Sequence, residues 1–573
     1  MEIVYLGEND MNKKWVYNDI DNEKVEYIRK KYNISELLAS ILVGRNIIED
    51  EEIKVFLNPT RKDFYDPFLL PDMEIAVNRI LRAIENNEKI MIYGDYDVDG
   101  ITSISVLKKF LEDRGLEVAE HIPNRLDEGY GLNKEAIDQI YKDGYRLMIT
   151  VDCGISGLEE VDYATSLGIE TIVTDHHEPL EELPKAIAVI DPKIKTSVYP
   201  FNQLAGVGVV FKLIQAIGIK LNLDEREYLK FLDLVSIGTI SDIVPLIDEN
   251  RVIAKLGLKL VEVTKNIGLK TLLDSAGYKK INSMSISFGV APRINACGRM
   301  GYAKEALKLF LTENKDEAIK LTEKLNEYNK NRQEIEKSIF EEALNKIDKE
   351  NVKEQNAIIL SGDTWHHGVI GIVASKITDM YFKPSILICF EENEGKGSGR
   401  SIPGFDLHKA LCETSQYLNK YGGHEMAVGL SISKDKFDMF KEAFEKYAAS
   451  TDISNIVPII NIDKLIIDKD LNLEAVKELE KLEPYGEANK CPLIAYKNLK
   501  IDSIRVLTEG KHIKLTLKTE NNNIITAIGF NMGYKAEDYL IGDKVDIVGT
   551  LEINSFNGND TIQFNLKDIM KSI

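Results

Sequence analysis

The sequence predicts an α/β protein in which a domain built on a parallel sheet precedes a smaller α/β domain and a C-terminal β-barrel. Three observations carry this prediction. Continuous apolar runs alternate with amphipathic segments up to about residue 250, which is typical of parallel strands covered by helices on both faces. The alternation returns in a shorter form after residue 350. From about residue 455, short runs of period two separated by turn residues indicate a small, closed or nearly closed barrel.

The chain has 573 residues, which exceeds what one hydrophobic core can serve. We therefore expect several segments with different roles. The predicted boundaries are an N-terminal helical segment at 1–75, the parallel-sheet domain at 76–302, a long connecting helix at 303–349, the smaller α/β domain at 350–450 and an OB-like barrel at 455–573.

Composition restricts the class of protein and its compartment. No stretch has the apolar length that a bilayer requires, and the N-terminus lacks the basic-then-apolar order of a signal peptide. Five scattered cysteines without a CxxC pair argue for a reducing compartment, so we expect a cytoplasmic protein without a membrane partner. The net charge of −21 argues against loose adhesion to nucleic acid, but it does not exclude a metal-lined cleft with local arginines.

The first domain is expected to bring several polar clusters to one edge of its sheet. Parallel strands end at the same edge, and each predicted strand here runs into a polar cluster. The predicted strands are residues 90–93, 147–151, 171–174 and 188–190, and the helices between them include 134–142 and 157–167.

Three carboxylates follow the first of these strands at every second position. If the strand continues, Asp95, Asp97 and Asp99 point to the same side, and a helix begins near Thr102 after a turn at Gly100. Such close like charges require a positive partner, and oxygen ligands suit Mg²⁺ or Mn²⁺. The alternative is an acidic, solvated loop or a helix cap.

The other strand ends add further acids and two imidazoles. Asp152 follows the second predicted strand, and Asp175, His176 and His177 follow the third. Asp242 stands inside the apolar run SIGTISDIVPL, where an unpaired carboxylate would be costly. Mixed carboxylate and imidazole ligands suit Mn²⁺, with Mg²⁺ possible, and the acids suffice for two cations that share a bridging carboxylate.

The remaining segments follow the same logic. Residues 251–302 are expected to be helical with an irregular ending at 291–295, and 304–349 to form one unbroken helix because no proline or glycine interrupts it. A glycine-rich hairpin, EENEGKGSGRSIPG, is expected in the smaller domain. The other predicted elements are strands 357–360 and 385–390, helix 369–380, and barrel strands 511–518, 524–530, 544–551 and 561–566.

Several motifs in order resemble those of the DHH phosphoesterase superfamily. GDYDVDG, VDCG, TDHHEP and SIGTISDIVPL are similar to motifs of its first domain, and GGHEMAVG is similar to the signature of the associated DHHA1 domain. RINACGRMG and GSGRSIPGFDL, together with the barrel, resemble the single-strand-specific exonucleases of the superfamily. The resemblance extends from about residue 40 to the C-terminus.

The resemblance implies a role for each matching position. It implies metal ligation by Asp95, Asp97, Asp99, Asp152, His176 and Asp242, with Asp152 as the bridge. His177 would orient a ligand or contact the scissile phosphate. Relatives often carry a histidine two residues before the first acid, where this chain has Tyr93. The implied substrate-binding residues are Arg125, Ser398 and Arg400 for a 5′-phosphate, Arg293 and Asn295 for a phosphate beside the metals, and His424.

The implied function is a 5′ to 3′ exonuclease specific for single-stranded DNA, which uses two divalent cations, Mn²⁺ or Mg²⁺, in DNA repair and recombination. A monomer, with a single-strand-binding protein and a helicase as partners, is implied in the same way. Arginine grips phosphate with a planar fork, and we expect Gly395, Gly397 and Gly399 to let the backbone approach that phosphate. The alternatives are a phosphodiesterase for oligoribonucleotides or cyclic dinucleotides, and a non-catalytic replication-associated binding protein.

Overall fold

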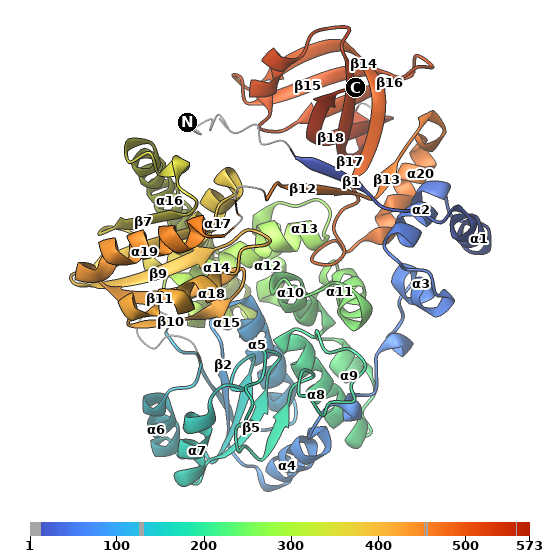
Figure 1. Ribbon diagram of the computed structural model, residues 1–573. Coiled ribbons are helices and arrows are strands. Elements are labelled where there is room, and N and C mark those ends of the chain that lie inside the picture. Colours follow the sequence, from blue (N-terminus) through green and yellow to red (C-terminus); the bar gives the residue numbers. More distant parts are fainter. Residues whose placement is uncertain (1–12, 125–130, 452, 454–455, 557, 573) are drawn as a thin grey trace. The chain divides into compact units, whose positions relative to one another are not determined.

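The computed structural model describes residues 13–124, 131–451, 453, 456–556 and 558–572. The chain divides into two compact units (Figure 1). The parallel-sheet unit comprises Lys54–Gln333 and Glu483–Lys490. The barrel unit comprises Met1–Ile53, Glu334–Leu482 and Cys491–Ile573. The short return of the chain to the parallel-sheet unit at Glu483–Lys490 was not predicted.

The parallel-sheet unit contains five parallel strands, which confirms the predicted fold class. Their order is β3-β2-β4-β5-β6. One face packs on helices α6 (Lys134–Lys142) and α7 (Leu158–Ser166), and the other on α4 (Met73–Asn86), α5 (Val98–Glu112) and α8 (Gly206–Lys220). The strands are β2 (Ile90–Gly94), β3 (Val118–His121), β4 (Leu147–Val151), β5 (Glu170–Thr174) and β6 (Ala188–Ile190).

The segment after β2 corrects the predicted continuation of the strand. β2 ends at Gly94, and α5 begins at Val98, four residues before the predicted start at Thr102. Asp97 is the N-cap of α5, and its Oδ1 accepts a hydrogen bond from the Gly100 amide at 3.1 Å. Asp99 therefore lies in the first helical turn, where a carboxylate interacts favourably with the helix dipole.

Two helical predictions after residue 250 are also corrected. The segment at 291–295 is not irregular but belongs to α14 (Ala291–Arg299), which follows the π-helical turn η3 (Ile286–Val290). The predicted single helix at 304–349 is two helices, α15 (Ala303–Leu311) and α16 (Lys315–Lys349). They separate at Thr312 and Asn314, and the Asn314 side chain accepts hydrogen bonds from the amides of Asp316 and Glu317 at the start of α16. The other helices here are α9 (Arg226–Leu229), α10 (Leu232–Ser241), α11 (Asp248–Val261), α12 (Ile267–Ala276) and α13 (Ser283–Ser285).

The barrel unit contains a second, mixed sheet with the order β10-β11-β9-β8-β7. Strands β8 and β9 form the predicted glycine-rich hairpin, and β9 lies between β8 and β11. The elements are β7 (Ile358–Gly362), α17 (His367–Tyr381), β8 (Ser385–Glu391), β9 (Glu394–Arg400), α18 (Leu407–Glu413), β10 (Lys420–His424), β11 (Ala427–Ser433) and α19 (Phe437–Ala449).

The C-terminal strands close into the predicted barrel. The order β14-β15-β16-β18-β17 is closed by pairing of β14 with β17. The N-terminal strand β1 (Lys14–Tyr17) pairs with β12 (Ile459–Ile462), and Trp15 Nε1 donates to Asp568 Oδ2 of β18 at 2.9 Å. The remaining elements are α1 (Asn22–Tyr32), α2 (Glu36–Gly44), α3 (Asp50–Leu57), β13 (Lys464–Leu465), α20 (Leu473–Glu478), β14 (Ile494–Leu507), β15 (His512–Lys518), β16 (Ile524–Gly529), β17 (Lys544–Phe556) and β18 (Asn559–Lys571).

Arg251 holds the returning segment Glu483–Lys490 inside the parallel-sheet unit. Its side chain is almost fully buried, and the guanidinium donates to the carbonyl oxygens of Phe56 (2.9 Å), Glu483 (3.0 Å) and Pro484 (3.4 Å). The Leu246 amide, four residues after Asp242, donates to the Glu487 carbonyl at 2.8 Å. The returning segment thus braces the loop that follows Asp242.

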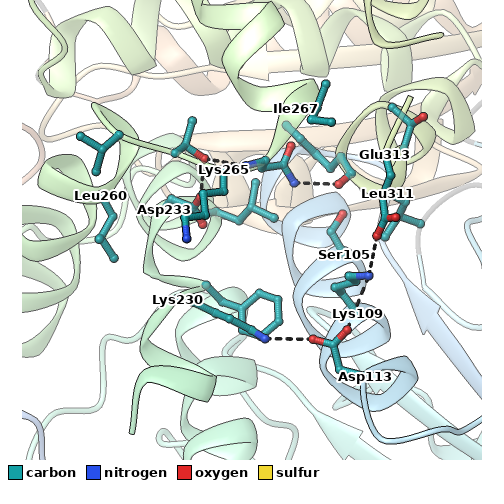
Figure 2. Close-up of a pocket in the computed structure, with 17 residues that line it drawn as sticks. Ser105, Lys109, Asp113, Lys230, Asp233, Leu260, Lys265, Ile267, Leu311 and Glu313 are labelled. Carbon is teal, nitrogen blue, oxygen red and sulfur yellow. Dashed lines mark hydrogen bonds and ion pairs between the residues drawn. The ribbon is translucent and has the colours of Figure 1, made fainter. Parts of the chain in front are cut away.

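One cavity of this unit lies away from the strand ends. It has a volume of about 730 Å³ and is lined by α5, α10, the α11–α12 connection and the end of α15. Figure 2 shows Lys109 and Lys230 paired with Asp113 at its rim. Ser105, its first lining residue on α5, lies six positions beyond Asp99, or about 9 Å along a helix. Of the helices in the described ranges, none has both the length and the apolarity for a membrane crossing.

Candidate metal centre

The acids and imidazoles predicted at the strand ends come together in three overlapping groups. Within each group the possible ligand atoms lie within 4.8 Å of one another. The groups are Asp95 with Asp97 and Asp152, Asp99 with His176 and Asp242, and Asp152 with His176 and His177. Asp152 and His176 each belong to two groups, so the cluster is continuous.

Asp99 is held in place by the start of α8, more than a hundred residues further along the chain. The amides of Gly206 and Val207 donate to its two oxygens at 2.7 and 2.8 Å. The positive end of the helix dipole therefore supports this buried carboxylate. Burial, followed by the charge of Asp97, still raises the pKa of Asp99 to about 7.

Asp152 has an uncommon backbone conformation and a crowded position at the end of β4. Its φ of +58° lies in the left-handed region, which is uncommon for residues other than glycine, although aspartate adopts it more readily than most. Gly206 faces it so closely that a Cβ there would lie 2.5 Å from Asp152 Oδ1. Uncommon backbone conformations of this kind persist where the surroundings determine them, and they are common at functional sites.

His176 lies between three carboxylates that come from different elements. Its Nε2 is 3.1 Å from Asp152 Oδ1, 3.6 Å from Asp242 Oδ2 and 3.9 Å from Asp99 Oδ2. Burial lowers the pKa of His176 to about 3, so the imidazole is neutral at pH 7 and can offer a lone pair to a metal.

Asp175 orients the second histidine and the backbone around it. Its Oδ1 accepts from His177 Nδ1 at 2.7 Å and from the His176 amide at 2.7 Å, and its Oδ2 accepts from the Ile155 amide at 2.9 Å. Burial acts to raise the pKa of Asp175, but the hydrogen bond and charge of His177, with the other bonds, outweigh it, so the pKa falls below the ordinary value. An ionised Asp175 fixes the proton of His177 on Nδ1.

The electrostatics of the cluster favour a bound cation. Burial raises the pKa values of Asp152 and Asp242 well above the ordinary value, and neighbouring carboxylates raise them further. Within the described part of the chain, Asp99 and Asp242 form no ion pair with lysine or arginine. A divalent cation would offset the clustered negative charge, and the oxygen-rich set with one imidazole fits Mn²⁺ or Mg²⁺.

Tyr93 occupies the position where the superfamily motif often has a histidine. The side chain is fully buried, its hydroxyl donates to the Gly131 carbonyl at 3.0 Å, and Asn133 Nδ2 donates to that hydroxyl at 3.1 Å. The ring packs on His121 with a centroid separation of 4.8 Å. These contacts give Tyr93 a packing role in the sheet.

The predicted phosphate contacts of the parallel-sheet unit are only partly described. Arg125 lies outside the described residues. Arg293 Nε donates to Asn326 Oδ1 at 2.7 Å, and its Nη1 donates to the Gly289 carbonyl. Asn295 Oδ1 accepts from the Val98 amide at 3.3 Å and so contacts the start of the acid-bearing helix.

The predicted substrate-binding residues of the barrel unit lie on β9 and β10, which are separated in the mixed sheet by β11. Arg400 and Ser398 are on β9, and Arg400 Nη1 donates to Ser398 Oγ at 3.1 Å. His424 ends β10, is exposed and accepts from the Met426 amide through Nδ1 at 3.3 Å.

The glycines of β9 have a different role from the predicted one. Both edges of β9 are paired with neighbouring strands, so these amides are not presented to a phosphate. Gly395, Gly397 and Gly399 share one face, where a Cβ would lie 2.6 to 2.8 Å from Phe390, Leu430 or Val428. The glycines allow β9 to pack closely on the core.

Sequence reasoning missed Gly206 and Val207, which hold Asp99, and the buried acid Asp191. The glycines at the start of the run LAGVGVVF were a signal for a helix that begins at a crowded polar site. Asp191 follows β6 in an Asp-Pro pair, and burial raises its pKa to about 7.

This fold and cluster define a protein of the DHH class. Residues 89–239 match the N-terminal domain of the DHH family, 354–450 match the DHHA1 domain and 462–568 match the RecJ OB domain. Asp242 lies just beyond the first match.

Relatives that match nearly the whole length of this chain show to which family of the DHH class it belongs. The single-stranded-DNA-specific exonuclease RecJ of Bacillus subtilis is 38% identical over 97% of this chain and 70% of its own length. The single-stranded-DNA-specific exonuclease RecJ of Haemophilus influenzae is 32% identical, and the match covers 92% of this chain and 95% of that protein. The crystal structure of Thermus thermophilus RecJ in complex with Mn²⁺ superposes with a TM-score of 0.86 at 29% identity, covering 98% of this chain and 80% of that one. The chain belongs to the RecJ family of single-stranded-DNA-specific exonucleases.

Proposed function

We propose that this protein is a metal-dependent exonuclease that degrades single-stranded DNA from the 5′ end, as expected for repair and recombination. The observation that carries the proposal is the convergence of Asp95, Asp97, Asp99, Asp152, His176 and Asp242 at one edge of the parallel sheet. Membership of the RecJ family and the C-terminal barrel support it over the alternatives, because small-substrate enzymes do not need such a barrel and a non-catalytic protein does not need the acids.

The residues present fit two divalent cations, Mn²⁺ or Mg²⁺. Asp95, Asp97 and Asp152 would hold one, and Asp99, His176 and Asp242 the other, with Asp152 close to both. When bound, two such cations activate a water molecule and stabilise the charge that develops on the entering and leaving oxygens of a phosphodiester.

The surrounding residues fix this cluster before substrate arrives. Gly206 and Val207 hold Asp99, and Asp97 is fixed as the helix cap of α5. His177 keeps its proton on Nδ1 and presents Nε2, which is suited to orienting a ligand or contacting the scissile phosphate. Preorganised polar groups of this kind need no rearrangement during the reaction.

We assign substrate binding to residues in both units. Arg293 and Asn295 would contact a phosphate near the cations, and Arg125, Ser398 and Arg400 the 5′-phosphate. His424, exposed at the end of β10, would contact the strand. The pairing of Arg400 with Ser398 orients the guanidinium, whose planar fork suits phosphate oxygens. The barrel would follow the strand by charge and base stacking.

The expected domain boundaries, oligomeric state, location and protein partners stay predictions. They are the domain boundaries at 1–75, 76–302, 303–349, 350–450 and 455–573, the monomeric state, the cytoplasmic location, and a single-strand-binding protein and a helicase as partners.

The test is digestion of strands with one labelled end. We expect a 5′-labelled single strand to release a labelled mononucleotide at the earliest times with Mn²⁺ or Mg²⁺. A 3′-labelled strand should shorten progressively, and a blunt duplex should remain intact. Release from the 3′ end first, or equal degradation of the duplex, would contradict the proposal. Digestion of dinucleotides alone would favour the small-substrate alternative.

A further inference from the structure

A second cavity of the parallel-sheet unit lies beside the acids. It has a volume of about 440 Å³, within the range of ligand-binding pockets. Its wall includes Tyr96, which stands between Asp95 and Asp97. The end of β3 contributes residues 121–124, and the junction of α14 and α15 contributes Gly298 and residues 301–305. Because β3 lies on the opposite side of β2 from β4 and β5, the cavity is on the side away from His176 and Asp242.

This cavity is tightly joined to the loop that carries the acids. A Cβ at Gly298 would lie 2.4 Å from the Tyr96 carbonyl oxygen, so α14 packs directly on that loop. Three residues earlier on the same helix, Asn295 accepts from the Val98 amide. A group bound in the cavity would therefore be positioned relative to Asp95 and Asp97.

Tyr302 presents an aromatic ring of fixed orientation at this cavity. The ring lies nearly parallel to that of Tyr328, with a centroid separation of 4.5 Å and an interplanar angle of 8°. The Tyr328 hydroxyl donates a hydrogen bond to the carboxylate of Glu305, which also forms an ion pair with Lys324 at 2.7 Å. These contacts fix the ring of Tyr328. Tyr302 is 48% exposed, so part of its ring remains accessible for a planar ligand to stack on.

We propose that this cavity is a nucleobase subsite, in which one base of the DNA strand stacks on Tyr302. The inference rests on the exonuclease function proposed above and specifies how the strand is held near the acids. Aromatic stacking accepts all four bases, as an exonuclease without sequence preference needs. Lys304 lines the same cavity, is exposed and forms no ion pair in the described part of the chain, so its ammonium group suits the phosphate of the same nucleotide.

The experiment combines Tyr302 variants with strands that lack one base. An abasic nucleotide is placed in turn at each of the first four positions from the 5′ end, and kcat/KM is measured for wild type, Tyr302→Leu and Tyr302→Phe. For wild type and Tyr302→Phe we expect one position at which loss of the base lowers kcat/KM on the order of tenfold. Tyr302→Leu should have a lower kcat/KM on the intact strand, and removal of the base at that position should not lower its kcat/KM further.

A binding measurement without hydrolysis completes the test. In EDTA, 2-aminopurine at the sensitive position should lose fluorescence when wild type binds, and the quenching should be weaker with Tyr302→Leu. Tyr141→Leu, an exposed tyrosine on α6, is the matched control and should behave as wild type in both measurements.

The proposal is overturned if Tyr302→Leu shows the same abasic profile and the same quenching as wild type. If wild type hydrolyses no strand, the proposed function fails, whereas the quenching measurement still decides whether the cavity binds a base.

Discussion

His176 Nε2 lies 3.1 Å from Asp152 Oδ1, although the two residues leave the sheet from different strands, β5 and β4. Both groups are buried, and the imidazole is neutral at pH 7, so it does not neutralise the carboxylates around it. Carboxylates therefore predominate among the described residues of the site, which favours the binding of a cation. Substitutions in this arrangement, and in the contacts that maintain it, should have measurable effects.

Replacing Asp152 by asparagine should separate catalysis from stability. We expect hydrolysis to fall about a thousandfold or more, because a catalytic metal is worth several kcal/mol and each 1.36 kcal/mol is tenfold in rate. The metal-free protein should become more stable, because burial and like charges raise the pKa of Asp152 and so disfavour its charged form. Calorimetry in EDTA and with Mn²⁺ measures both stabilities.

The same series has an internal control. Asp143→Asn, at the exposed end of α6, should leave hydrolysis and both melting temperatures unchanged. Asp152→Asn should bind single strands nearly as well as wild type in EDTA. A variant that keeps wild-type hydrolysis, or that gains as much stability from Mn²⁺ as wild type does, would remove Asp152 from the metal site.

The carboxyl group of Asp191 should make the metal-free protein sensitive to pH. Burial raises its pKa in the folded state to about 7, whereas the unfolded value is about 3.9. Its stabilising contribution is therefore complete below about pH 4 and is lost as the pH rises through about 7.

The measurement that checks this is the difference in the free energy of unfolding between wild type and Asp191→Asn in EDTA. Between about pH 5 and pH 7 the variant should gain stability relative to wild type by up to about 1.4 kcal/mol per pH unit, measured by denaturant unfolding. A difference that stays constant over this range would mean that Asp191 does not titrate there.

A single methyl group at Gly206 should weaken metal binding. The Cβ of Gly206→Ala would lie 2.5 Å from Asp152 Oδ1, so Asp152 or the start of α8 must move. We expect the Mn²⁺ affinity, measured by titration calorimetry, to fall about 10- to 100-fold, as for other residues that support metal ligands.

Gly208→Ala, on the same helix, provides the comparison. Its nearest neighbour would be Leu204 at 3.5 Å, an ordinary contact, so Mn²⁺ affinity should be unchanged and helix stability slightly higher. Equal Mn²⁺ affinities for the two variants would show that the contact between Gly206 and Asp152 is not important.

Loss of the Arg251 side chain should release the returning segment Glu483–Lys490. Arg251→Met removes the buried hydrogen bonds to Phe56, Glu483 and Pro484 while keeping much of the packing. We expect about 2–4 kcal/mol of destabilisation and faster proteolysis within the segment.

The surface pair Arg226–Asp224 serves as the control for this prediction. Arg226 is exposed, so Arg226→Met should change stability by less than about 1 kcal/mol and leave proteolysis unchanged. Resistance of Arg251→Met to cleavage at the segment would show that other contacts hold it.

The sequence predicted those parts of the site that depend on local pattern. Apolar strands that end in polar residues indicated the sheet edge where Asp95, Asp152 and His176 now meet. The helix start at Val98 was misplaced because Asp97 acts as an N-cap, and a cap cannot be told from a strand residue by alternation alone. The break between α15 and α16 had a local signal in Thr312 and Asn314, which are good caps, but the absence of proline and glycine hid it.

The features that were missed depend on contacts between distant segments. No local pattern shows that the amides of Gly206 and Val207 hold Asp99. The hydrogen bond from Arg251 to the Glu483 carbonyl likewise joins segments that lie more than two hundred residues apart in the sequence. Glycines 395, 397 and 399 suggested a phosphate loop, because their composition fits that role as well as it fits close packing in a sheet.

The most direct test of the account is an anomalous-scattering crystal structure of the protein with Mn²⁺. We predict two Mn²⁺ peaks at the carboxyl edge of the parallel sheet, contacted by Asp95, Asp97, Asp99, Asp152, His176 and Asp242, with Asp152 touching both. Peaks elsewhere, or none at this edge in crystals of an active preparation, would contradict the assignment of these residues to a two-metal site.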